Sequence, residues 1–166
     1  MAEVGVLSPD DRVELIEGEL IDMPPIGERH ARGVDMLAKR LIRAVGESAY
    51  LRIQGPVRLG AHSVPHPDLI LLAASTDSYR TAPPTGTDVL LIIEVSESTL
   101  RYDLEVKAPL YARHEVPEYW VLDLVNNALH RFRLPTGGYY AQHDVVKTRI
   151  VRFEALSVDV DIEDLF

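Results

Sequence analysis

Two acidic residues stand at the ends of apolar runs that predict buried strands. Asp68 opens the run Asp-Leu-Ile-Leu-Leu, and Glu94 stands near the end of the run Leu-Leu-Ile-Ile-Glu-Val. A carboxylate in such a place loses hydration worth several kcal/mol unless a cation compensates it. Lys107 follows a short way downstream. This combination predicts a site for a hard divalent cation and a phosphodiester substrate, which is typical of a nuclease.

The expected ligands follow from the chemistry of the ion and from strand geometry. Mg²⁺ and Mn²⁺ prefer oxygen ligands and keep several waters. We expect the carboxylates of Asp68 and Glu94 and the backbone carbonyl of Val95 to bind the ion, because this carbonyl directly follows Glu94 on the strand. The ion would polarise the phosphate, and Lys107 would assist the attacking water. Asp103 lies four residues before Lys107 and could hold its ammonium group in place.

The same residues resemble a known superfamily. Asp68 followed by Glu94 resembles the metal-binding pair of PD-(D/E)XK nucleases, and the long string from Glu94 to Asp123 resembles the Uma-two branch of restriction endonucleases. The resemblance extends to Glu14–Leu20, to His30 and to His66-Pro67-Asp68. It implies a restriction-endonuclease-like fold, hydrolysis of DNA, Mg²⁺ or Mn²⁺ as cofactor, and Asp68 and Glu94 as metal ligands.

The main departure from the family pattern is the position of the lysine; milder ones are Glu115, where a glycine is common, and His66, where an arginine is common. The motif lysine normally lies two residues after the glutamate, where this chain has Ser96. The resemblance implies that Lys107, on the following helix, takes the place of that lysine. A long side chain on a helix that packs over the strand can reach the same point in space.

Three further acidic or basic residues are secondary candidates. His30 begins the apolar face of its helix and should point toward the sheet, where a hydrogen-bonded core histidine is a simpler interpretation than a catalytic one. Glu14 and Glu19 belong to a short strand pair that could reach the edge of the site. Among these, His30 and Glu19 join Asp103 as candidates for supporting roles.

The order of predicted elements indicates an α/β (α+β) fold. We expect a restriction-endonuclease-like mixed β-sheet flanked by helices, with an N-terminal strand pair and a C-terminal β-meander. Pro109 should kink the second helix or fall in its first turn. The expected strands are 14–22 (a pair), 50–59, 68–72, 89–95, 119–124, 129–134, a strand from 139, 150–153 and 158–162; the expected helices are a short helix or turn at 8–12, then 28–46 and 100–114.

Composition limits the class of protein. The chain has 166 residues, no cysteine and a formal net charge of −9. The length fits one domain over residues 1–166, and no apolar stretch approaches the ~20 residues that a membrane-spanning helix needs. We therefore expect a cytoplasmic protein without membrane contact, and an apolar edge of the meander could support a homodimer. The negative charge opposes the basic footprint usual for a DNA-binding protein.

Two alternatives remain open at this stage. His62, His66 and Asp68 could lie on one side of an extended segment and form a zinc site, because zinc favours imidazole and carboxylate ligands. The other alternative is a catalytically degenerate nuclease-fold protein that binds DNA or a protein partner. The acidic charge and the missing in-line lysine favour it, whereas the presence of Asp68, Glu94 and Lys107 counts against it.

Overall fold

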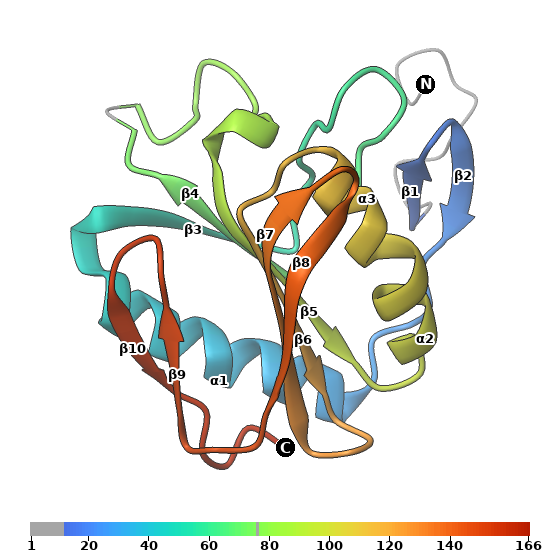
Figure 1. Ribbon diagram of the computed structural model, residues 1–166. Helices are drawn as coiled ribbons and strands as arrows, with labels where there is room; N and C mark the ends of the chain where they lie inside the picture. Colours follow the sequence, from blue (N-terminus) through green and yellow to red (C-terminus); the bar gives the residue numbers. More distant parts are fainter. Residues whose placement is uncertain (1–11, 76) are drawn as a thin grey trace.

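A six-stranded mixed β-sheet forms the centre of the computed structural model, which describes residues 12–75 and 77–166. Its strand order is β3-β4-β5-β6-β7-β8 (Figure 1), and every neighbouring pair is antiparallel except β5–β6, which is parallel. The strands are β3 (Ala49–Ile53), β4 (Leu69–Ala73), β5 (Val89–Ser96), β6 (Glu118–Asp123), β7 (Ala128–Thr136) and β8 (Tyr139–Val146). The expectation of a mixed sheet flanked by helices is confirmed.

Helix α1 (Glu28–Val45) covers one face of this sheet (Figure 1). Its apolar residues recur at helical spacing, and Val34, Leu37 and Leu41 are buried. They pack against Leu91 and Ile93, whose side chains leave β5 on that side. The helix ends at Gly46, whose φ of 52° is one that few residues other than glycine adopt easily.

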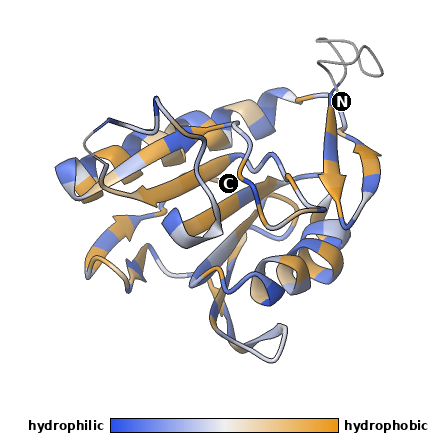
Figure 2. Ribbon diagram, turned by 90° about the horizontal axis from the view of Figure 1, so that it is seen from above, coloured by the Kyte–Doolittle hydropathy of each residue, from blue (hydrophilic) through white to orange (hydrophobic). Residues whose placement is uncertain are grey.

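The opposite face is covered by a helical segment in three parts. It consists of α2 (Leu100–Tyr102), a π-helical turn η4 (Asp103–Lys107) and α3 (Ala108–Arg113). Pro109 lies in the first turn of α3, as one of the two predicted outcomes requires, and the preceding turn is widened to π geometry. Figure 2 shows hydrophobic and hydrophilic residues alternating around the helices, while the central strands are largely hydrophobic.

Two separate strand pairs complete the fold. The N-terminal pair β1 (Val13–Ile16) and β2 (Glu19–Asp22) is antiparallel, as predicted. The C-terminal strands β9 (Ile150–Phe153) and β10 (Val158–Asp161) form a pair of their own and pack against α1, while β6, β7 and β8 form the meander of the main sheet. Two short 3₁₀ turns, η2 (Gly46–Ser48) and η3 (Gly86–Asp88), precede β3 and β5.

Two predicted elements differ from the structure or lie outside its described residues. The predicted strand 50–59 ends at Ile53, because Gly55-Pro56 interrupts it; Arg58 and Leu59 form only isolated bridges. The predicted helix or turn at 8–12 lies outside the described residues, except for Arg12, which has no regular structure. Within the described part of the chain, none of the helices is both long and apolar enough to cross a membrane.

Candidate active site

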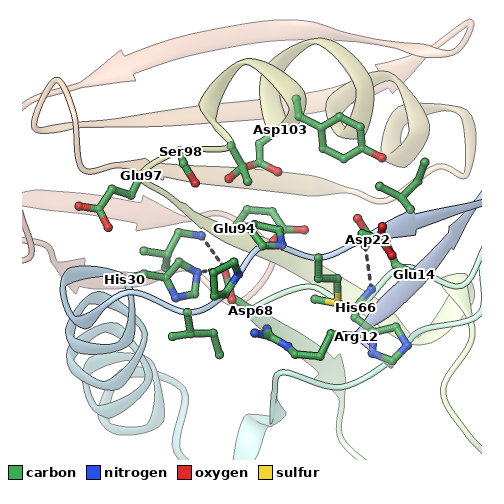
Figure 3. A pocket seen from close by; sticks show the side chains of 18 of the residues that line it. Arg12, Glu14, Asp22, His30, His66, Asp68, Glu94, Glu97, Ser98 and Asp103 are labelled. Carbon is green, nitrogen blue, oxygen red and sulfur yellow. Dashed lines mark hydrogen bonds and ion pairs between the residues drawn. The ribbon is translucent and has the colours of Figure 1, made fainter. Parts of the chain in front are cut away.

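A cavity of about 510 Å³ opens where the N-terminal strand pair meets one end of the central sheet. It is walled by β1 and β2, by the segment 23–27, by the start of α1 and by the turns that follow β5 (Figure 3). Asp68, Glu94, Lys107, His30 and Asp103 all line it. Val95 lines it as well, so the structure brings together six of the seven predicted site residues, and only Glu19 lies elsewhere.

The sheet register explains why the two motif carboxylates meet. Leu69 of β4 pairs with Ile93 of β5, so Asp68 comes to lie beside Glu94 on the neighbouring strand. The Asp68 Oδ2 atom accepts a hydrogen bond from the Val95 backbone N–H at 2.9 Å. Because this N–H belongs to the residue after Glu94, Asp68 is fixed directly to the strand that carries the second carboxylate.

His30 of α1 is a second hydrogen-bond partner of Asp68. Its Nε2 atom lies 3.0 Å from the same Oδ2 atom (Figure 3). This hydrogen bond raises the pKa of His30 above its usual 6.5, although burial of the ring opposes the shift. The Nδ1 atom of His30 is buried without a hydrogen-bond partner among the described residues. His30 is therefore a hydrogen-bonded histidine that lines the cavity, rather than one enclosed in the apolar core.

Glu94 accepts two hydrogen bonds from one turn of the covering helix. Lys107 Nζ donates to Glu94 Oε1 at 2.9 Å, and the Tyr111 hydroxyl donates to the same atom at 3.0 Å. The two donors lie four residues apart, so they project from the same side of the helix. The Glu94 Oε2 atom accepts no hydrogen bond from the described residues. One carboxylate oxygen is therefore fixed, and the other is left for a ligand from the cavity.

The protonation states of Glu94 and Lys107 depend strongly on burial. The side chains of Glu94 and Lys107 are 6% and 7% exposed. Burial raises the pKa of Glu94 to about 8, even though Lys107 acts in the opposite direction. Burial also acts to lower the pKa of Lys107, but Glu94, Glu14 and Asp103 outweigh it and raise that pKa. The lysine therefore remains an ammonium group at neutral pH.

Asp103 links the helical segment to the end of β5. Its Oδ2 atom accepts hydrogen bonds from Ser96 Oγ and from Thr99 Oγ1, both at 2.6 Å. Its Oδ1 atom lies 3.9 Å from Lys107 Nζ. Ser96, which occupies the position of the in-line superfamily lysine, thus anchors the helix that carries Lys107. The carboxyl group of Asp103 has a raised pKa because it is buried, despite the nearby ammonium group.

Two residues that were not main candidates take part in the site, and one candidate does not. Glu14 is buried; its Oε1 atom lies 3.3 Å from Lys107 Nζ, and its Oε2 atom accepts the backbone N–H of His66 at 3.3 Å. Tyr111 was not predicted, although its spacing of four residues from Lys107 was a usable signal. Glu19 is exposed on β2 and does not line the cavity.

A divalent cation fits the donors present. Three carboxyl groups, those of Glu14, Glu94 and Asp103, lie within 3.9 Å of Lys107 Nζ, and Asp68 lines the same cavity, so carboxyl groups outnumber the one ammonium group. Asp68 Oδ1 has only the Gln54 amide at 3.5 Å as a partner among the described residues. Two weakly engaged carboxylate oxygens and room for water suit Mg²⁺ or Mn²⁺. The Val95 carbonyl as a third ligand stays a prediction.

Among the described residues, the histidines do not complete the zinc site that the sequence allowed at His62, His66 and Asp68. In the ranges 12–75 and 77–166, no group of three or more His, Asp or Glu side chains is arranged to enclose an ion. His66 and Asp68 line the cavity, but His62 is exposed and is not among its lining residues. The arrangement therefore gives no support to the zinc alternative that used His62 and His66.

Comparisons with known proteins agree with this fold. The Uma2 family model, described as "Putative restriction endonuclease", matches residues 3–162. A crystal structure from Anabaena variabilis ATCC 29413, described as a "putative nuclease belonging to DUF820", superposes with a TM-score of 0.77 at 15% sequence identity, covering 99% of this chain and 94% of the other. No curated protein matches the sequence. On the family match, which spans nearly the whole chain, the protein belongs to the Uma2 family of restriction-endonuclease-like proteins.

Proposed function

We propose that this protein is a nuclease that hydrolyses DNA phosphodiester bonds with the help of Mg²⁺ or Mn²⁺. The observation that carries the proposal is the pairing of Asp68 with the β5 backbone at 2.9 Å beside Glu94, in one cavity with Lys107. Membership in a nuclease family supports a nucleic-acid substrate. When bound, the ion would supply Lewis acidity to the scissile phosphate and to the attacking water.

In this proposal Asp68 and Glu94 bind the ion, and hydrogen bonds from neighbouring groups fix the two carboxylates in position. His30 and the Val95 N–H fix one oxygen of Asp68, which leaves its other oxygen for the ion. Lys107 and Tyr111 do the same for Glu94. Such fixed ligands bind a cation without further loss of side-chain freedom.

Lys107 acts as a charge and a hydrogen-bond donor in this account. Its raised pKa keeps it protonated, so it does not accept a proton from water at neutral pH. Its ammonium group can instead stabilise negative charge that develops on the phosphate, since it already lies beside Glu94 at 2.9 Å. We propose that His30, whose Nδ1 atom is unpartnered among the described residues, orients a water molecule or a phosphate oxygen.

A cleavage assay tests this function directly. Supercoiled, linear and single-stranded DNA are incubated with Mg²⁺, Mn²⁺ or EDTA and with wild type, Asp68→Asn or Glu94→Gln. We expect cleavage by wild type with either ion and none in EDTA. Each variant should lose at least about 100-fold in rate, because a lost ligand removes several kcal/mol of stabilisation from the transition state.

The matched control is Glu19→Gln, which makes the same acid-to-amide change on an exposed residue outside the cavity. It should cleave like wild type. DNA binding by wild type that is unaltered by Mn²⁺ and by Asp68→Asn, with no cleavage of any substrate, would contradict catalysis. That result would favour the alternative of a nuclease-fold protein that only binds DNA or a protein partner.

A further inference from the structure

Two histidines outside the cavity form a pair on neighbouring strands. His130 of β7 and His143 of β8 lie on the same face of the sheet, and His143 is directly opposite Phe132, two residues from His130 (Figure 1 shows the two strands side by side). His130 Nδ1 lies 3.1 Å from His143 Nε2. Neither residue lines the candidate active site.

A buried carboxylate supports His130 from behind. Asp123, at the end of β6, is 1% exposed, and its Oδ2 atom lies 3.4 Å from His130 Nε2. The carboxylate is itself fixed by the backbone N–H groups of Val125 and Asn126 and by the Asn126 side-chain amide. A proton on Nε2 that points to Asp123 leaves a lone pair on Nδ1, the atom that faces His143. A carboxylate behind a histidine in this way is the usual support of a metal-binding imidazole.

The second imidazole is accessible and also held in place. His143 is exposed, and its ring stacks on Phe132 with centroids 4.1 Å apart and planes 8° apart. The planes of the two imidazole rings are 24° apart and their centroids are 5.3 Å apart, so the two ring nitrogens face each other along the hydrogen bond. Binding of an ion between them would need the His143 proton to move to Nδ1 and a rotation about the side-chain torsions of this exposed residue.

We propose that His130 and His143 bind a divalent transition-metal ion of the kind that prefers imidazole, such as Zn²⁺, Ni²⁺ or Cu²⁺. Two imidazole nitrogens that share one Zn²⁺ at about 2.0–2.1 Å lie roughly 2.9–3.4 Å from each other when the angle at the metal is between about 90° and 110°. The observed separation of 3.1 Å falls in this range. Water fills the remaining positions, since only two protein ligands are available at this exposed place.

This site is independent of the proposed nuclease function. The cavity presents carboxylate oxygens, which suit Mg²⁺ and Mn²⁺, whereas the histidine pair presents nitrogens, which bind those ions poorly. The pair joins β7 to the edge strand β8, so a bound ion would cross-link the edge of the sheet. We therefore expect the bound ion to stabilise the native protein.

Calorimetric titration of the full chain with ZnCl₂ tests the proposal. We expect Asp68→Asn, which removes a proposed ligand of the cavity, to retain one zinc ion per chain. Adding His143→Gln to Asp68→Asn should weaken zinc binding at least about tenfold, as loss of one of two ligands requires. His62→Gln, which changes an exposed histidine on another loop, should bind zinc like wild type, and a large excess of Mg²⁺ should not compete.

Thermal unfolding gives a second measurement. In the Asp68→Asn background, zinc should raise the melting temperature of the protein and of its His62→Gln variant but not that of its His143→Gln variant. The proposal is overturned if Asp68→Asn binds no zinc at millimolar concentration, or if adding His143→Gln to it leaves zinc binding unchanged. Either result would mean that the two imidazoles are joined only by their hydrogen bond.

Discussion

Lys107 is surrounded by more carboxyl groups than one ammonium group neutralises. Glu94, Glu14 and Asp103 lie 2.9, 3.3 and 3.9 Å from its Nζ atom. All four side chains are almost fully buried, so water screens their charges poorly. The ammonium group thus stabilises the site without a metal, and an added cation would complete the balance of charge.

The first prediction at this scale concerns removal of that ammonium group. Lys107→Met should destabilise the protein by about 3–5 kcal/mol in EDTA at pH 9, above the pKa of about 8 that burial gives Glu94, because it leaves buried carboxylates without a counter-charge. Adding Glu94→Gln to Lys107→Met should recover part of the loss, since one of those charges is then removed. Urea unfolding of the two single variants and the double variant measures both effects. A single variant as stable as wild type, or a double variant no better than Lys107→Met, would contradict this account.

A second prediction concerns Glu118, which lies outside the site. It is 3% exposed and accepts the Trp120 Nε1–H at 2.7 Å. Burial raises the pKa of Glu118 above its usual 4.5, although the hydrogen bond opposes the shift. The native state therefore retains this proton at a pH where the unfolded chain has lost it. Its contribution to stability falls as pH rises from about 4.5 through the native pKa.

Urea unfolding at pH 5 and pH 7 checks the sign of this effect. The stability of Glu118→Gln relative to wild type should increase between pH 5 and pH 7, because the amide does not titrate. The exposed control Glu19→Gln should show no such increase. If the relative stability of Glu118→Gln instead decreases with pH, the burial argument for Glu118 is wrong.

The sequence predicted the residues that line the cavity better than the side chains that form hydrogen bonds with them. Asp68, Glu94 and Lys107 were predictable because a charge in an apolar run, or at a family motif position, is visible in the sequence. Tyr111 and Ser96 were not predicted as partners. The contact of Ser96 with Asp103 depends on the π turn that begins at Asp103, because the turn sets the direction of that side chain and the local sequence pattern does not predict it.

At the scale of elements, close packing of α1 on β5 brings His30 to Asp68. Gly33 lies one turn after His30, and a Cβ atom at this position would stand only 3.0 Å from Val95 Cγ1. Val95 follows Glu94 and donates its N–H to Asp68. The absence of a side chain at Gly33 therefore lets the helix approach the strand that carries the site.

Gly33→Val tests this close approach. The added atoms would overlap Val95, so we expect a loss of about 1–3 kcal/mol in the free energy of unfolding. Lys39→Val, on the exposed side of the same helix, introduces the same β-branched residue and should cost less than about 0.7 kcal/mol. Urea unfolding compares the two variants. Equal losses would show that helix propensity, and not the contact with β5, determines the effect.

Predictions of elements from the sequence were most accurate where periodicity is strong. The expected helix 28–46 and the observed α1 differ by a single residue at the end, since six apolar or small positions face the sheet. The sequence predicted the second helix and the disturbance that Pro109 causes in it. It did not predict the π turn that precedes the proline. The separate pairing of β9 with β10 could not be predicted, because strand pairing depends on contacts that the local pattern does not encode.

At the scale of the whole molecule, the net charge of −9 affects how DNA could approach. Two of the five Lys and Arg side chains of α1 have acidic partners: Arg29 lies 3.4 Å from Glu97, and Arg40 lies 3.4 Å from Asp161. They offer little free charge to phosphates. The divalent cation is therefore expected to contribute both to chemistry and to substrate affinity. A homodimer stays a prediction.

The most direct measurement is anomalous diffraction from a crystal of the whole protein soaked in MnCl₂. The account predicts one strong manganese peak in the cavity, within about 2.0–2.3 Å of a carboxylate oxygen of Asp68 and of Glu94. The peak should disappear in Asp68→Asn and persist in Glu19→Gln. A cavity without manganese, or an ion bound away from both carboxylates, would contradict the claim that these residues converge on one cation.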